Sequence, residues 1–174
     1  EKLKPVELNA KEGLSLINGT QVSTALGVKA LFEARNVLYS ADIISALSVE
    51  SSLSTRQAFN PSIHKLKKHR GQNISAKNIY YLLSGSKIVN SHKDCDKVQD
   101  PYCMRCIPHI HGTSWEVFSN TEKTINNEIN SISDNPLIFP NGSIRNSGHF
   151  HAEPVAQAHL LELRRQREEV RRRV

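Results

Sequence analysis

One long helical pattern limits how this 174-residue chain can fold. From about Gln21 to Leu53, apolar residues recur at spacings of three and four, which is typical of one face of a helix. A helix of that length spans about 50 Å and needs other helices along its sides. Small residues in the pattern permit close helix packing. They are Ala25, Gly27, Ala30, Ala34, Ala41 and Ala46.

Three further helices are predicted by the same spacing, over residues 72–84, over 109–132 and from near Pro154. Gly85 is placed to cap the first of them. Residues 54–71 are expected to be a connection, 86–108 a long polar loop, and 133–143 a turn-rich strand or loop. Because no strong strand alternation occurs, the fold class is all-α, a bundle of long helices.

The positive charge is concentrated at one end of the chain. The net charge is +6, and Arg164 to Val174 contribute +4 of it. We therefore divide the chain into a helical domain over residues 1–156 and a basic helical tail over 157–174. A solvated helix is the default interpretation of such a tail, with an RNA-binding module as an alternative.

The three cysteines do not form a disulfide framework in this interpretation. Their number is odd and no signal peptide precedes them, so a reducing cytoplasm is expected. Cys103 and Cys106, with His109 and His111 close behind, suggest zinc, but a second pair of ligands is missing. We expect no metal here, and we expect the cysteines to be buried as small apolar residues.

Other catalytic patterns are weak. His149, His151 and Glu153 lack the spacing of metal ligands on one helix face, so they are interpreted as polar loop residues. A Ser-His-Asp triad stays open, since all three residue types are common. The sequence contains neither the Gly-x-Ser-x-Gly elbow of hydrolases nor a phosphate-binding loop.

The polar segment around residues 99–105 carries the best site candidates. Arg105 can bind a carboxylate through two parallel hydrogen bonds. Tyr102 can transfer a proton or donate a hydrogen bond. Gln99 and Asn18 each offer a side-chain amide to a small polar ligand. Together they indicate a binding site for a small polar molecule, without yet defining a reaction.

Five stretches of the chain, in this order, resemble the histidine ammonia-lyase family. They are KEGLSLINGTQVSTAL at Lys11 to Leu26, HRGQ at His69 to Gln72, SHKDCDKVQDPYCMRC at Ser91 to Cys106, SDNPLIF at Ser133 to Phe139, and HFHAEPVA at His149 to Ala156. The NGTQ segment is shared with the wider aromatic amino-acid lyase superfamily. The combination of VQDPY, a following arginine and SDNP narrows the resemblance to the histidine branch.

The resemblance implies a cytoplasmic homotetramer of the ammonia-lyase and fumarase-like type that converts L-histidine to trans-urocanate and ammonia. It implies an electrophilic methylidene-imidazolone (MIO) group made from an Ala-Ser-Gly triplet. Asn18 would lie beside that group, Gln99 would contact it or the substrate, and Phe150 would be a nearby aromatic residue. Tyr102 would reach into a neighbouring subunit's site, and Arg105 would bind the substrate carboxylate. Neither a membrane nor a nucleic acid is expected as a partner.

The chain also departs from the family pattern. It contains no Ala-Ser-Gly triplet, and His149 stands where the family usually has asparagine. After about Gln157 the resemblance ends. We therefore expect an internal fragment that is inactive alone, with exposed apolar surface and a tendency to aggregate. A non-catalytic scaffold or assembly relic is the alternative.

Overall fold

The computed structural model describes residues 3–158 and 160. Its helices, in chain order, are α1 (Glu12–Ile17), α2 (Gln21–Ser51), the 3-10 helix η1 (Arg56–Phe59), α3 (Pro61–Lys65), α4 (Arg70–Leu82), α5 (Lys87–Ser91), α6 (Tyr102–Arg105) and α7 (Ile107–Ile129). Two short strands follow, β1 (Leu137–Ile138) and β2 (Ile144–Arg145), and residues 153–158 are again helical.

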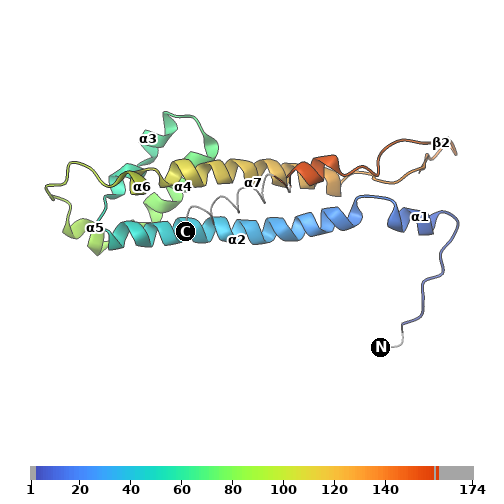
Figure 1. The fold of residues 1–174 in the computed structure, drawn as a ribbon, viewed down its shortest axis with the longest axis horizontal. Coiled ribbons are helices and arrows are strands. Elements are labelled where there is room, and N and C mark those ends of the chain that lie inside the picture. Colours follow the sequence, from blue (N-terminus) through green and yellow to red (C-terminus); the bar gives the residue numbers. More distant parts are fainter. Residues whose placement is uncertain (1–2, 159, 161–174) are drawn as a thin grey trace.

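The frame of the molecule is the pair of long helices α2 and α7, which run side by side in opposite directions (Figure 1). Helix α4 packs against both of them. The expectation of an all-α fold built on one long helix is thus confirmed, and α2 ends at Ser51, two residues before the predicted end. The two strands pair antiparallel as a small hairpin beyond the helices.

The two segments predicted as connections contain short helices. Local capping explains these turns: Asn60 accepts a hydrogen bond from the backbone N–H of Ser62 at the start of α3. Ser86 likewise accepts from the backbone N–H of Val89 at the start of α5. Helices of four or five residues are too short to show a periodic pattern, so the sequence predicted only loops there.

The longer helices agree with the prediction to within a few residues. Helix α4 ends at Leu82, and Gly85 has a φ of 76°, the left-handed conformation expected of a C-terminal glycine. Helix α7 begins at Ile107, because Pro108 fits the first turn, where its missing N–H costs no hydrogen bond. The predicted turn-rich segment forms the hairpin, with Gly142 at a φ of 77° in its turn.

Two apolar clusters fill the seams between the helices. The first joins the C-terminal ends of α2 and α4 to η1 through Val49, Phe59 and Ile79. The second lies midway along α2 and α7 and contains Leu38, Trp115 and their neighbours. Phe59 and Ile79 are almost completely buried. Burial of such side chains provides the main driving force for packing the helices.

A buried carboxylate joins all three core helices. Asp42 of α2 is only 1% exposed and accepts hydrogen bonds from Ser75 Oγ at 2.7 Å and Asn78 Nδ2 at 2.8 Å, both on α4. From α7, His111 Nδ1 lies 3.0 Å from Asp42 Oδ1, and Trp115 Nε1 donates to Oδ2 at 3.3 Å. These four partners satisfy the carboxylate inside the core. We call them the Asp42 cluster.

One side of α2 carries apolar side chains that no described element covers. Its members share a single helix face at spacings of three, four, seven and eleven residues. They are Val22, Leu26, Val37, Ile44 and Leu47, each at least half exposed. The expected exposed apolar surface is thus present, and its continuity along the helix is typical of a face that packs against another protein surface.

We expect the purified chain to self-associate through this α2 face. Substituting Val37→Lys and Ile44→Lys removes the middle of the face without touching the core, since these side chains are 50% and 61% exposed. Light scattering should show a lower average mass for that variant. A matched control, Asn120→Lys with Asn127→Lys, adds the same charge on exposed polar positions of α7, away from the α2 face. An unsubstituted chain that is already monomeric would contradict the prediction.

Two of the predicted segments, the basic tail and the last helix, lie at the C-terminal end of the chain. The basic tail from Arg164 to Val174 lies outside the described residues. The helix predicted from near Pro154 is present over residues 153–158, as far as the described part of it extends. Within the described residues, no helix combines the length and the apolar character that crossing a membrane requires.

Candidate functional site

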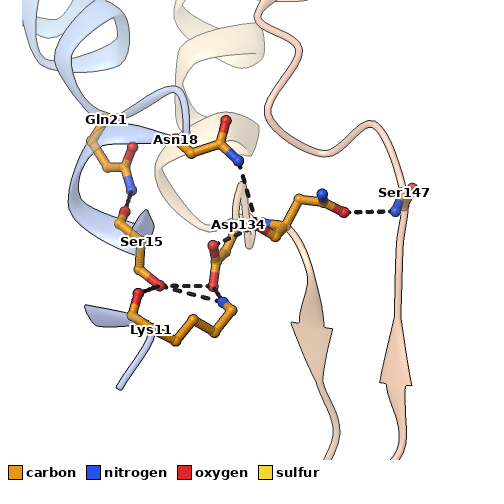
Figure 2. Close-up of polar contacts among 7 residues, drawn as sticks. Lys11, Ser15, Asn18, Gln21, Asp134 and Ser147 are labelled. Carbon is orange, nitrogen blue, oxygen red and sulfur yellow. Dashed lines mark hydrogen bonds and ion pairs between the residues drawn. The ribbon is translucent and has the colours of Figure 1, made fainter. Parts of the chain in front are cut away.

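At one end of the helix pair, two motif stretches far apart in sequence meet. Figure 2 shows the segment before α2 facing the segment that follows α7. Asn18 Nδ2 donates a hydrogen bond to the backbone carbonyl of Asn135 at 3.4 Å. Asn135 Oδ1 in turn accepts from the backbone N–H of Ser147 at 2.7 Å, which ties the segment after β2 to the same place. We call this region the Asn18 end.

An ion pair holds the Asn18 end together. Lys11 Nζ contacts the Asp134 carboxylate, and Ser15 Oγ donates to the same carboxylate oxygen at 3.2 Å. The hydrogen bond from Lys11, helped by those from the Asn135 backbone and Ser15, holds the pKa of Asp134 below its usual range. Asp134 is therefore ionised at neutral pH, and its charge fixes the segment that carries Asn135.

We expect the Lys11–Asp134 pair to appear in an NMR titration of the Asp134 carboxyl carbon. Because the folded-state pKa lies below the unfolded value of about 3.9, the pair stabilises the fold above that pH. The contribution is lost as pH falls through the folded-state pKa. Lys11→Gln should raise the Asp134 midpoint toward the usual value, whereas Ser15→Ala should raise it less. An unchanged midpoint in Lys11→Gln would contradict the pairing.

A surface hollow lies next to this ion pair. It has a volume of about 670 Å³ and is lined by apolar side chains such as Ile138 and Phe139, together with Lys11, Asp134 and His149. That volume is in the range of small-molecule sites, which combine apolar walls with a few polar groups. His149 Nδ1 lies 2.7 Å from Ser147 Oγ, so its ring is oriented by the loop.

Three other predicted site residues lie around α6, at the opposite end of α2. Tyr102 is 76% exposed and Gln99 is also exposed, while Arg105 is partly buried. Arg105 Nε donates to the backbone carbonyl of Asp100 at 2.9 Å. The bond occupies the inner nitrogen of the guanidinium and leaves its two Nη atoms in a geometry suited to a bidentate carboxylate. We call this region the Arg105 end.

The structure thus separates the predicted site residues into two groups. Helix α2 has 31 residues and spans about 45 Å, with Asn18 before its start and α6 beyond its end. Figure 1 shows α1 and α6 at opposite ends of the helix pair. Phe150, partly exposed, follows β2 and stacks at 5.3 Å against His151. One copy of the chain therefore does not bring Asn18 and Arg105 into one site.

The cysteines are not buried, contrary to our expectation. Cys95 and Cys103 are exposed and Cys106 is partly buried. The reason is that α6 turns its Met104 side chain toward the first apolar cluster, which leaves Cys103 on the outer side. Among the described residues, no three or more His, Cys, Asp or Glu side chains are grouped to hold a metal ion.

Histidines near the start of α7 form a separate polar cluster. His64 is buried, with Nε2 2.9 Å from the Ala58 carbonyl and Nδ1 2.9 Å from Gln72 Nε2. The ring of His109 lies 5.7 Å from it. Burial lowers the pKa of His109, and the nearby positive charge of Lys67 lowers it further. A neutral His109 ring therefore packs here at physiological pH.

Glu153 also has a lowered pKa. His151 Nδ1 lies 2.7 Å from Glu153 Oε2, and this hydrogen bond is the main cause. Both side chains are about two-thirds exposed. The pair is therefore local and holds the start of the last helical segment.

Sequence reasoning did not single out Lys11, Asp134 or Asp100. All three lie inside stretches that carried the family resemblance, yet charged residues in polar segments are ordinarily solvated. Only their contacts reveal their roles, since Lys11 meets Asp134 across more than one hundred residues of chain. Asp100 is buried beside α6.

The fold matches that of enzymes of the ammonia-lyase and aminomutase class. Histidine ammonia-lyase from Trypanosoma cruzi superposes with a TM-score of 0.77 at 39% identity, over 90% of this chain and 28% of that one. Tyrosine aminomutase from Streptomyces globisporus gives 0.80 at 30% identity, over 90% and 33%. Phenylalanine ammonia-lyase from Rhodosporidium toruloides gives 0.80 at 32%, over 90% and 24%.

The sequence profile described as aromatic amino acid lyase matches residues 1–159, and the chain belongs to that family. Histidine ammonia-lyase from Gloeobacter violaceus is 46% identical over 157 residues, which are 90% of this chain. The enzyme of the same name from Caenorhabditis elegans is 45% identical over 161 residues. The chain spans 30% and 24% of the length of these two relatives.

Proposed function

We propose that this chain is the central part of a histidine ammonia-lyase subunit, which eliminates ammonia from L-histidine to give trans-urocanate. The relatives at 45–46% identity that carry this name support the substrate. The observation that carries the proposal is the placement of family-matching polar groups at both ends of α2, on a fold shared with the T. cruzi enzyme. The proposed location is the cytoplasm.

Each end has a defined task in the proposed reaction. Arg105 binds the substrate carboxylate and Tyr102 relays a proton. Asn18 and Gln99 place amide groups where charge develops, and Phe150 supplies an aromatic wall. Since about 45 Å separates the two ends of α2, a complete site takes the Asn18 end of one subunit and the Arg105 end of another. This geometry supports a site shared between subunits, and we propose the homotetramer as the assembly that provides it.

The proposed prosthetic group cannot form from residues 1–174. MIO forms from an Ala-Ser-Gly triplet, and the sequence has none. It would supply the electrophile that activates the amino acid. The polar groups of the Asn18 end form hydrogen bonds with one another, which positions their side chains. None of these groups is an electrophile, so they cannot replace MIO. We therefore expect the isolated chain to be inactive.

Grafting tests the proposal directly. The matching segment of G. violaceus histidine ammonia-lyase is replaced by the 157 matched residues of this chain, and urocanate absorbance is followed with L-histidine. We expect activity from the graft and none from the chain alone. Arg105→Lys should raise KM, Tyr102→Phe should lower kcat, and Tyr81→Phe, at another exposed tyrosine, should change neither. A folded, assembled graft without activity would favour the scaffold alternative.

A further inference from the structure

The loop that presents Tyr102 and Arg105 has a buried charged anchor, Asp100. Its side chain is 6% exposed, although most of residues 92–103 is exposed. A buried carboxylate requires hydrogen-bond donors to offset its lost hydration. Asp100 has one on another element, because its Oδ2 accepts from the backbone N–H of Thr55 at 2.6 Å.

The two atoms of Asp100 that make contacts face different partners. The carboxylate holds the loop to the connection between α2 and η1, where Thr55 lies. The backbone carbonyl accepts the hydrogen bond from Arg105 Nε at 2.9 Å. Asp100 thus connects the Arg105 guanidinium to the segment between α2 and η1. A charged acceptor makes the bond to Thr55 stronger than an ordinary one.

Further contacts restrain the orientation of this loop. Pro101 follows Asp100, which restricts Asp100 to extended backbone and begins the turn of α6. On α6, Met104 packs against the first apolar cluster while Tyr102 points outward. Asp100 and Met104 therefore hold the inner side of the loop, with Tyr102 on its outer side and Arg105 partly buried.

We propose that Asp100 is a positioning residue for substrate-carboxylate binding: its anchoring to the Thr55 N–H holds Arg105 in its binding orientation. The role rests on the proposed function, in which Arg105 binds the carboxylate of L-histidine. Asp100 itself does not touch the substrate. Losing the anchor leaves Arg105 present but free to adopt other orientations, so binding weakens more than the chemical step.

The contact can be broken from either side. Asp100→Ala removes the acceptor. Thr55→Pro removes the donor together with the threonine hydroxyl, and the φ of −80° at Thr55 suits proline. Thr55→Ala is the matched control, because it keeps the N–H and loses the hydroxyl that caps Gln57. Asp100→Asn keeps an acceptor oxygen and should largely rescue the anchor.

The first readout does not depend on activity. Hydrogen exchange of the full chain, followed by mass spectrometry, should show faster exchange over residues 102–106 in Asp100→Ala and Thr55→Pro. Thr55→Ala should exchange like the unsubstituted chain. Exchange that is unchanged in both broken variants would overturn the anchor, whatever the enzyme activity.

The second readout uses the grafted enzyme. We expect KM for L-histidine to rise about tenfold in Asp100→Ala and Thr55→Pro, with a smaller change in kcat, since a charge-assisted bond is worth about that factor. The double variant should be no worse than either single one. A fall in kcat at unchanged KM would indicate mere loss of folded enzyme and overturn the positioning role. If the graft is inactive while hydrogen exchange of the chain still depends on Asp100, the proposed function is rejected and the anchor is established.

Discussion

Asp42→Ala is expected to lower the free energy of unfolding by about 3–5 kcal/mol, the usual cost of removing one partner from a buried charged network. The substitution leaves Ser75 Oγ and Trp115 Nε1 as donors in the core without an acceptor. Water cannot easily replace the carboxylate, because Ser75 is fully buried. The substitution weakens the packing of α2, α4 and α7 together, since the Asp42 cluster joins all three.

Urea unfolding of the chain carrying Val37→Lys and Ile44→Lys measures this effect with little interference from association. Circular dichroism is the main probe, because Trp115 contacts Asp42 and its fluorescence depends on the cluster directly. Glu33→Ala on the same helix is the matched control: its carboxylate is largely exposed and should cost well under about 1 kcal/mol. A similar small cost for Asp42→Ala would show that the cluster contributes little.

The Asp42 cluster illustrates what the sequence could not predict. Apolar spacing placed the long helix correctly, and Asp42 fell inside the pattern as one polar position among many. Its partners come from two helices that lie 33 to 73 residues further along the chain. Spacing rules describe one helix at a time, so they identify its faces but not which polar side chain is buried between helices.

The candidate site was predictable only in part, because its residues could be recognised from the sequence but their positions in space could not. The motif stretches around Asn18 and Arg105 were recognised from their residues, and their site roles stay predictions. Their separation by the length of α2 follows only from the fold (Figure 1). The wrong expectation for the cysteines has a local cause, because a four-residue helix gives no periodicity from which to tell the outer Cys103 from the inner Met104.

Close contact between α4 and α7 also depends on residues that the sequence reasoning passed over. We assigned close packing to small residues of α2, but α4 and α7 approach closely through Gly71 and Gly112. A Cβ atom built on Gly71 would lie 2.0 Å from the carbonyl oxygen of Gly112. A Cβ atom on Gly112 would lie 2.4 Å from backbone atoms of Gln72. The two helices therefore touch there backbone to backbone.

Gly71→Ala should therefore destabilise the fold by about 3 kcal/mol, the upper part of the usual range for overpacking. The clash is with backbone, so no side-chain rotation relieves it, and α4 has to move away from α7. That movement also strains the bond from the Gly71 N–H to Glu116 Oε1, which is 2.7 Å long. Urea unfolding followed by circular dichroism measures the loss.

Gly13→Ala is the matched control for that substitution. Gly13 is in helix α1, and its new Cβ would make an ordinary contact, 3.8 Å from Cδ1 of Leu8 in the preceding segment. Alanine favours a helix over glycine by about 1 kcal/mol, so this variant should be neutral or slightly more stable. Changes of opposite sign in the free energy of unfolding of Gly71→Ala and Gly13→Ala would separate the effect of close packing from that of helix propensity. If Gly71→Ala behaved like Gly13→Ala, α4 and α7 would have room to separate, and the glycine contact would not determine their packing.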